Sequence, residues 1–304
     1  MRTFPALEIL WPAAPDEDTV DQLMAALDDT APTAVEELPL GVRVFFVTEA
    51  DRDAAAAVVT SASPAATVTS LLVPDDQWAE RSQAALHPVR VGQLIIAPPW
   101  TIDVTGAVMM PALSHDDAGA EAPDAIVIAI QPSMGFGTGH HASTRLCLRL
   151  LQRHIPLDGS VLDIGTGSGV LAIAAWRLGA SRALGIDFDR DALMSAAENI
   201  ERNQAGAHVS LEVRDITTDA ATLAGRFELV FANITGAMLE RNAAAIVSTL
   251  ADDGLLIASG FQTHERDEVV AAFDRAGLPL LDAAEEDTWV ATAFRRERPA
   301  PEAK

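Results

Sequence analysis

The chain has 304 residues, 49% of them hydrophobic, so it can bury one large core or two smaller ones. Its 44 acidic and 21 basic side chains give a formal charge of -23, which disfavours direct nucleic-acid binding; it suits a basic partner, or simply keeps the protein soluble. Without a secretory signal or the roughly 20-residue apolar run of a membrane span, the chain is expected to be cytoplasmic.

The first 73 residues predict a small α+β domain. Apolar and alternating segments indicate strands and helices in the order βαββαβ, the split βαβ or ferredoxin-like arrangement. The strands are expected at 6–11, 33–39, 41–50 and 66–73, and the helices at 16–29 and 51–62.

A second domain is expected over residues 74–297, with a disordered tail at 298–304. Its first part predicts a short helix at about 75–85, one strand that the double proline at 98 and 99 ends, an exposed loop at 114–123 and a strand at 125–132. Cys147, the only cysteine, lies among leucines that indicate the apolar face of a helix.

From residue 160 onward, strand and helix patterns alternate. Continuous apolar strands between helices are typical of a parallel sheet covered on both faces, so we expect a doubly wound, Rossmann-like α/β domain. The strands are expected at 160–165, 182–189, 208–215, 227–235 and 254–260, and the helices at 169–180, 190–204, 236–251 and 264–277. A last strand at 288–296 is expected at an antiparallel edge of the sheet.

The segment "VLDIGTGSGV" places Gly165, Gly167 and Gly169 between a strand and a helix. Glycines there permit a tight turn and a close approach of the backbone to a ligand. A dinucleotide-binding turn requires G-x-G-x-x-G, but its last position holds Val170. The G-x-G-x-G spacing, with Asp163 ahead of it, instead favours an S-adenosylmethionine site.

Three further strand ends carry polar side chains. Asp187 is expected to accept hydrogen bonds from both ribose hydroxyls, whereas Asp189 can cap the next helix. Asn233 follows the fourth strand and can contact the cofactor or a substrate amine, or simply close the strand-to-helix turn. Asp215, after the third strand, is placed to meet the adenine amino group.

With these segments in order, the chain resembles the PrmA family of methyltransferases, which modify ribosomal protein L11. The resemblance rests on "GFGTGHHAST", "LCLRLL", "VLDIGTGSGVLAIAAWRLGA", "GIDFD", "AENIERN" and "ANI", with "HPVRVGQLIIAPPW" upstream. It covers residues from about 76 to 295, and the smaller domain matches in layout only.

The resemblance implies an enzyme that transfers methyl groups from S-adenosylmethionine to lysine side-chain amines, N-terminal amines or both. It implies that Thr144, Gly165, Asp187 and Asn233 contact the cofactor and that the first domain recognises the basic ribosomal protein. We expect a monomer without a metal ion, and no catalytic acid, base or nucleophile is assigned. The chain departs from the family with His140 in place of threonine, Ala142 in place of proline and Thr235 in place of leucine.

The loop before Thr144 contains Gly135, Gly137 and Gly139, and we interpret it as a lid over the adenosine site. His140 and His141 are open to a general-base role or to hydrogen bonding within the loop, whereas adjacent histidines rarely ligate one metal ion. The alternatives for the whole chain are a methyltransferase for another protein or a small molecule, and a cofactor-binding module without catalysis.

Overall fold

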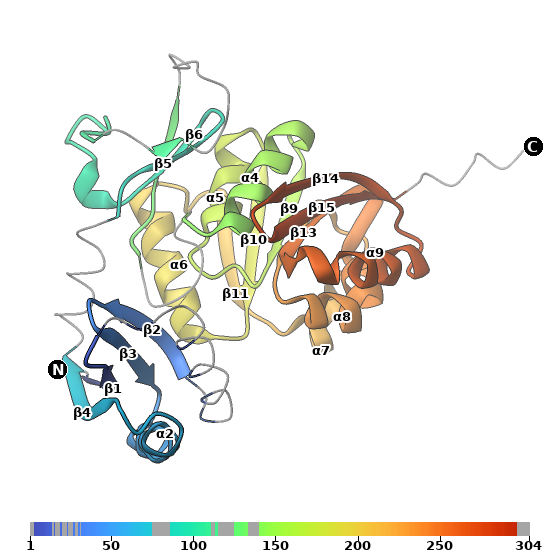
Figure 1. Ribbon diagram of the computed structural model, residues 1–304. Coiled ribbons are helices and arrows are strands. Elements are labelled where there is room, and N and C mark those ends of the chain that lie inside the picture. The colour runs from blue at the N-terminus through green and yellow to red at the C-terminus, as the bar shows by residue number, and fades with distance from the viewer. Residues whose placement is uncertain are drawn as a thin grey trace, which may run out of the picture. The chain divides into compact units, whose positions relative to one another are not determined.

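The structure, a computed structural model, describes residues 3–13, 15, 19, 23, 27, 30, 32–74, 86–110, 113–114, 125–132 and 140–296. The chain forms two compact units, residues 1–85 and 86–304, and each is described by itself (Figure 1). The expected helix at 75–85, nearly all of the loop at 114–123 and the tail lie outside the described residues. The boundary expected after residue 73 therefore stays a prediction.

Unit 1 is a four-stranded antiparallel sheet in the order β2-β3-β1-β4, with the helix α2 packed on it. Its elements are β1 (Thr3–Leu10), β2 (Pro32–Leu38), β3 (Gly41–Phe46), α2 (Glu49–Ala62) and β4 (Thr67–Pro74). Leu7, Val44 and Val59 are fully buried between the sheet and α2. The four expected strands and the expected second helix are confirmed, whereas most of the helix expected at 16–29 lies outside the described residues.

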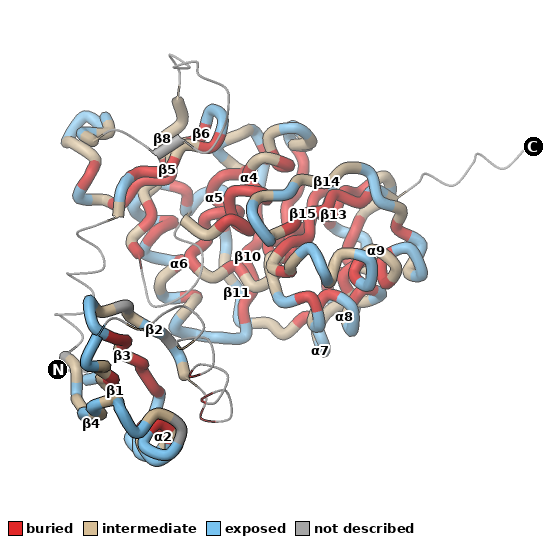
Figure 2. Tube along the Cα trace, viewed as in Figure 1, coloured by how far each residue is buried: buried red, intermediate tan, exposed pale blue. Residues whose placement is uncertain are grey.

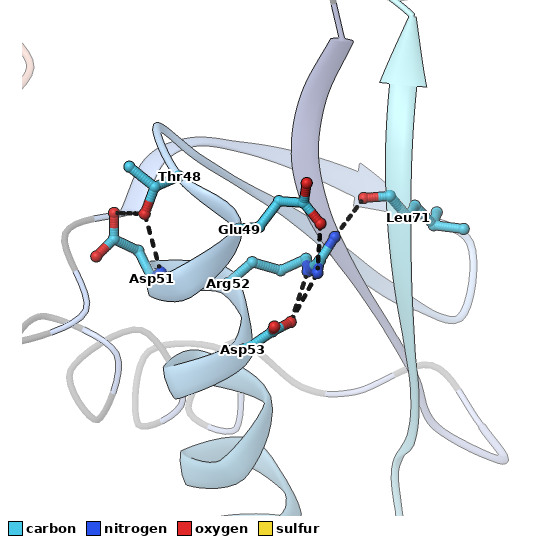
Figure 3. Close-up of polar contacts among 6 residues, drawn as sticks. All are labelled: Thr48, Glu49, Asp51, Arg52, Asp53 and Leu71. Atoms are coloured by element: carbon cyan, nitrogen blue, oxygen red, sulfur yellow. Dashed lines mark hydrogen bonds and ion pairs between the residues drawn. The ribbon is translucent and has the colours of Figure 1, made fainter.

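Polar contacts fix the first turn of α2 against β4 (Figure 3). Thr48 caps the helix, because its hydroxyl oxygen accepts from the Asp51 N–H at 3.1 Å. The buried Arg52 guanidinium pairs with Asp53 at 2.7 Å and donates to the Leu71 carbonyl of β4 at 3.4 Å. Arg52 thus joins helix and sheet without leaving its charge unpaired.

Unit 2 is built around a seven-stranded sheet in the order β11-β10-β9-β12-β13-β15-β14. The five strands from β11 to β13 are parallel, and β15 runs antiparallel to both of its neighbours, β13 and β14. The strands are β9 (Ser160–Ile164), β10 (Arg182–Asp187), β11 (Val209–Val213), β12 (Phe227–Asn233), β13 (Leu250–Gln262), β14 (Leu280–Glu286) and β15 (Trp289–Arg295). The expected parallel α/β sheet is confirmed.

Helices cover both faces of this sheet, which leaves β9 buried at all of its positions (Figure 2). One core contains α4 (Ala142–His154), α5 (Val170–Arg177) and α6 (Arg190–Arg202). The opposite core contains α7 (Ile216–Leu223), α8 (Gly236–Thr249) and α9 (Arg266–Arg275). The short 3-10 helices are η2 (Pro99–Thr101) and η3 (Thr263–Glu265). Burial on both faces explains why the central strands are continuously apolar in sequence.

A second, small sheet packs on the face of α4 and α5, in the order β7-β5-β6-β8. Its strands are β5 (Val89–Val91), β6 (Leu94–Ala97), β7 (Leu113–Ser114) and β8 (Ile126–Ala129). The prediction of one strand before the double proline was wrong, because Val91 pairs with Leu94 and the chain reverses between them. Gly92, with φ at +57°, permits this two-residue turn.

The seven-stranded sheet also differs from expectation at the edge formed by β15 and β14. The last strand, β15, is antiparallel as expected, but it is not the edge, because β14 pairs along its outer side. We did not predict β14 or α7. The side chains of β14 are exposed or only half-buried, so the segment lacks the apolar alternation that indicates a strand.

The Gly260→Ala variant tests how closely the chain packs beside β12. Gly260 has φ at +92°, and an added Cβ would lie 2.5 Å from the Ile234 carbonyl oxygen. We expect the free energy of unfolding in urea to fall by about 3 kcal/mol. The matched control, Gly277→Ala, has φ at +79° but nothing within 4 Å of the added Cβ, and should lose about 1 kcal/mol. Equal losses would mean that the contact with Ile234 is unimportant.

Candidate cofactor site

Three of the predicted site residues lie at one level on neighbouring strands. Ile164 of β9 pairs with Ile186 of β10 on one side and with Ala232 of β12 on the other. Gly165, Asp187 and Asn233 each come directly after a member of this aligned set. From β9 the chain adds β10 and β11 on one side of the sheet and then β12 and β13 on the other side. At such a point, where the order of strands reverses, α/β sheets form a ligand crevice at their carboxyl edge.

The glycine turn between β9 and α5 is narrow because three of its residues have left-handed backbone conformations. Gly165, Gly167 and Gly169 have φ values of +68°, +53° and +79°. The N–H groups of Gly165 and Thr166 both donate to the Ile186 carbonyl, at 2.9 and 3.0 Å. A side chain at any of the three glycines would strain the turn. The turn therefore leaves its backbone open to close approach by a ligand.

Asp187 and Asp189 have separate functions, which the sequence left open. Asp189 is the N-cap of α6 and accepts from the Asp191 N–H at 2.9 Å. Asp187 accepts from Gly167 N–H at 3.2 Å and from Asp189 N–H at 3.0 Å. A carboxylate can accept about four hydrogen bonds, so Asp187 keeps acceptor capacity for a ligand. Asp215 is the N-cap of α7, and its predicted contact with adenine stays a prediction.

Asp163, two residues ahead of Gly165, is a buried carboxyl group with one oxygen that forms no hydrogen bond among the described residues. The side chain is 1% exposed, Oδ2 accepts from the Thr166 hydroxyl at 2.7 Å, and Oδ1 has no hydrogen bond among the described residues. Burial raises the pKa of Asp163 to about 6, and the Thr166 hydroxyl and the Ala172 backbone N–H offset this only in part. A buried oxygen of this kind suits a cationic ligand group, which would supply the missing hydrogen bond.

The first turn of α4 brings Thr144 to the same edge of the sheet. Cys147, three residues later, lies beside Ser259, which pairs with Asn233 across β12 and β13. At the start of the helix, the His141 ring packs edge-on against Trp289, with centroids 4.4 Å apart. Trp289 pairs with Gln262, which is three residues beyond Ser259 in β13. From Cys147 back to His141, α4 therefore extends toward the carboxyl end of β13. The buried Thr144 lies between these two contacts.

Cys147 has the environment of a packing residue. Burial raises the pKa of its thiol, the charge of Asp163 raises it further, and a hydrogen bond with Ser259 lowers it. A buried thiol that resists ionisation is a poor nucleophile, in agreement with its leucine neighbours in sequence.

Asn233 ends β12, and the residue after it is tightly enclosed. Ile234 donates its N–H to the Ser259 carbonyl at 3.1 Å, and its Cγ2 lies 2.8 Å from where a side chain would begin at Gly165. This packing holds the backbone beside Asn233 against the glycine turn. No hydrogen bond of the Asn233 amide occurs within the described residues, so the amide can serve a ligand.

The two histidines take part in local structure. His141 is the N-cap of α4, and its Nδ1 lies 2.7 Å from the Ser143 hydroxyl. Burial, with a smaller effect of Arg145, lowers the pKa of His141 and favours the neutral ring. His140 Nε2 lies 2.8 Å from the His87 carbonyl. The general-base reading stays a prediction, and the glycines of the proposed lid lie outside the described residues.

Ion pairs hold α4 on β14, and sequence reasoning missed them. Arg145 binds Glu286, with Nε 2.7 Å from Oε1, and also donates to the His140 carbonyl. Arg149 binds the second oxygen of Glu286 at 2.9 Å, and His154 binds Asp282 at 2.9 Å. Arg145 makes these contacts one residue after Thr144, whereas His154 holds the opposite end of the helix. No local signal predicts them, because β14 lies about 130 residues away in sequence.

Phe188 is a second residue that sequence reasoning missed. It follows Asp187 directly, and 76% of it is exposed. An exposed large aromatic side chain beside a ligand crevice indicates a role in binding more strongly than one elsewhere on the surface.

Ala142 is one departure from the family pattern that the structure explains. It is the first residue of α4 after the His141 N-cap. Proline is favoured at this position because its missing N–H would have no helical partner anyway. Alanine is also a strong helix former, so the helix start is preserved.

The described residues contain neither a candidate membrane span nor a candidate metal site. Within the described ranges, no helix is long and apolar enough to cross a membrane. Across the same residues, no group of three or more His, Cys, Asp or Glu side chains is arranged to hold a metal ion.

Comparisons with known proteins give consistent matches. Residues 17–297 match the family described as Ribosomal protein L11 methyltransferase (PrmA). A ribosomal protein L11 methyltransferase of Geobacter sulfurreducens is 37% identical over 286 residues, covering 90% of this chain and 87% of the relative. One of Pelotomaculum thermopropionicum is 39% identical over 233 residues, covering 76% and 70%. The crystal structure of a ribosomal protein L11 methylase from Lactobacillus delbrueckii subsp. bulgaricus aligns with a TM-score of 0.56 and 25% identity, covering 70% of this chain and 99% of that one.

The raised pKa of Asp163 predicts a pH-dependent effect of Asp163→Asn. The folded-state pKa of about 6 exceeds the ordinary 3.8, so ionisation at pH 7.5 destabilises the folded state by about 3 kcal/mol. This cost disappears as the pH falls through 6 toward 4 and the folded carboxyl binds a proton. The variant should therefore be more stable than the parent in urea at pH 7.5, with a smaller gain at pH 4.5. An equal gain at both pH values would contradict the assignment.

Proposed function

Because the chain belongs to the ribosomal protein L11 methyltransferase (PrmA) family, we propose that it methylates amines of ribosomal protein L11, on lysine side chains, at the N-terminus or both. The main support for the proposal is that Gly165, Asp187 and Asn233 lie at the same level on neighbouring strands, where the strand order of the sheet reverses. The finer fold assignment is a doubly wound, Rossmann-like domain preceded by a ferredoxin-like domain, in keeping with both strand orders.

The chemistry of the site fits S-adenosylmethionine, which supplies a methyl group on a positively charged sulfonium. The free acceptor capacity of Asp187 suits the two ribose hydroxyls, and the unpartnered oxygen of Asp163 suits the cationic amino group. The glycine turn that begins at Gly165 admits the cofactor close to the backbone, and Thr144 borders the same edge. These residues form the proposed cofactor site.

Phe188 is proposed as an apolar cover for the adenine ring. Its position next to Asp187 places an aromatic side chain beside the proposed ribose contact. Stacking on a base would shield the exposed ring from water, which accounts for an aromatic residue at a surface position.

Methyl transfer to an amine requires alignment more than acid-base chemistry. A lysine amine of pKa near 10.4 is neutral in about one molecule per thousand at pH 7.4, which corresponds to a cost of about 4 kcal/mol. Burial lowers that pKa, and a carbonyl acceptor can orient the neutral amine. Asn233 presents both an amide oxygen and an amide N–H₂ at the crevice, so we assign it to orienting the substrate amine.

Unit 1 is proposed to bind the protein substrate. Residues 1–85 contain 15 acidic and 4 basic side chains, so a large share of the negative charge lies in this smaller unit. A negatively charged surface attracts a basic ribosomal protein and increases its rate of association at low salt.

A labelling experiment tests the proposed function. The protein is incubated with methyl-labelled S-adenosylmethionine and unmethylated ribosomal proteins, and labelled peptides are identified by mass spectrometry. We expect label on amines of ribosomal protein L11, and none with Asp187→Ala, which lacks the proposed ribose contacts. The control Asp189→Ala removes only the α6 cap and should keep the activity. Label confined to other proteins would contradict the substrate assignment.

The role of Asn233 is tested separately with Asn233→Ala. If the amide orients the substrate amine, kcat should fall by a factor on the order of 100, while the cofactor Kd measured by titration calorimetry changes little. Normal turnover would rule out the orienting role. A weakened cofactor Kd with normal kcat at saturation would move Asn233 to the cofactor instead.

A further inference from the structure

The side chain of Asn199 in α6 joins two backbone segments at the cofactor site. It is fully buried, and both of its polar atoms are bonded to main chain. Its Nδ2 donates to the Ser168 carbonyl at 3.0 Å, and its Oδ1 accepts from the Gln131 N–H at 2.8 Å. One carboxamide therefore satisfies a buried carbonyl and a partly buried N–H that are far apart in sequence.

The Ser168 end of this bridge lies inside the glycine turn. Ser168 stands between Gly167 and Gly169, where the backbone is least restricted by side chains. The same face of α6 packs directly on the turn, because a Cβ added at Gly169 would lie 3.4 Å from the Ala196 Cβ. Ala196 and Asn199 are three residues apart on one helix face, so α6 supports the turn by packing and by a hydrogen bond together.

The Gln131 end lies in a different part of unit 2. Gln131 follows β8, which belongs to the small sheet and not to the seven-stranded one. Asn203, the C-cap of α6, makes a similar double contact with β8: Oδ1 accepts from Ala129 N–H at 2.9 Å, and Nδ2 donates to the Ala129 carbonyl at 2.7 Å. Asn203 thus attaches the small sheet to α6, whereas Asn199 extends the attachment to the glycine turn.

We propose that Asn199 is a positioning residue for cofactor binding: it holds the Ser168 carbonyl so that the glycine turn keeps its ligand-ready conformation. Three positive-φ glycines give the free turn many conformations, and a turn ordered before binding loses less entropy when the ligand arrives. The inference rests on the proposed cofactor site, because it names what keeps that site in shape.

The matched substitutions Asn199→Asp and Asn203→Asp test this inference. Each keeps one acceptor oxygen and loses the donor N–H₂, but only the first loss occurs at the glycine turn. Arg202, whose Nη1 lies 3.3 Å from Asn199 Oδ1, gives the new carboxylate a cationic neighbour. The readouts are the Kd of S-adenosylmethionine by titration calorimetry, the cofactor KM and kcat, and the thermal midpoint.

We expect Asn199→Asp to weaken cofactor Kd and raise cofactor KM about tenfold, with kcat at saturating cofactor within about twofold of the parent. Asn203→Asp should leave Kd and KM within about twofold of the parent, even where its thermal midpoint falls. An unchanged Kd in Asn199→Asp, or equal losses in both variants, would overturn the inference. If Asn199→Asp does not fold, Asn199→Ala, which adds no charge, is compared with Asn203→Ala by the same criteria.

Asp187→Ala separates this inference from the proposed site. If the parent does not bind S-adenosylmethionine, or Asp187→Ala binds it as tightly as the parent, the proposed cofactor site is wrong. If the parent binds, Asp187→Ala loses affinity and Asn199→Asp does not, only the positioning role of Asn199 fails.

Discussion

The parallel pairing of β9 with β10 and β12 is the constraint from which the site follows. Side chains in a strand alternate with a period of two, so a slip of one residue in either pairing would turn Asp187 or Asn233 to the opposite face. Burial of β9 on both faces makes such a slip costly, because it would move apolar side chains out of two cores at once. The packing that stabilises unit 2 therefore also sets the level of the site residues.

Around this edge, buried polar groups are paired to other parts of the chain, and Asp163 is the exception that the proposed site uses. Ser259 donates to the Val290 carbonyl, and Asn199 joins Ser168 to Gln131. Asp163 retains an oxygen with no partner among the described residues. An unsatisfied buried oxygen costs free energy, and such costs are tolerated where a ligand supplies the bond. The oxygen that lowers the stability of the free protein is thus the one available to bind a ligand.

Much of unit 2 could be predicted because its signals are local. Continuous apolar strands, helix periodicity and the three glycines of the turn predicted the parallel sheet and the strand ends that carry Asp187 and Asn233. The errors occurred where local signals are weak or ambiguous. The hairpin of β5 and β6 looks like one apolar strand interrupted by a glycine, and β14 has little apolar alternation because both of its faces are partly exposed.

The order of residues along the chain was enough to indicate the fold class, the turn and the residue types suited to S-adenosylmethionine, since turn chemistry and periodicity act over a few neighbouring residues. The position of Thr144 required the folded structure, because α4 is held by Trp289 and by Glu286, both distant in sequence. The free oxygen of Asp163 and the bridge made by Asn199 likewise exist only after strands and helices have packed. The partners of Asn199 lie 30 to 70 residues away in sequence, and no local pattern encodes such contacts.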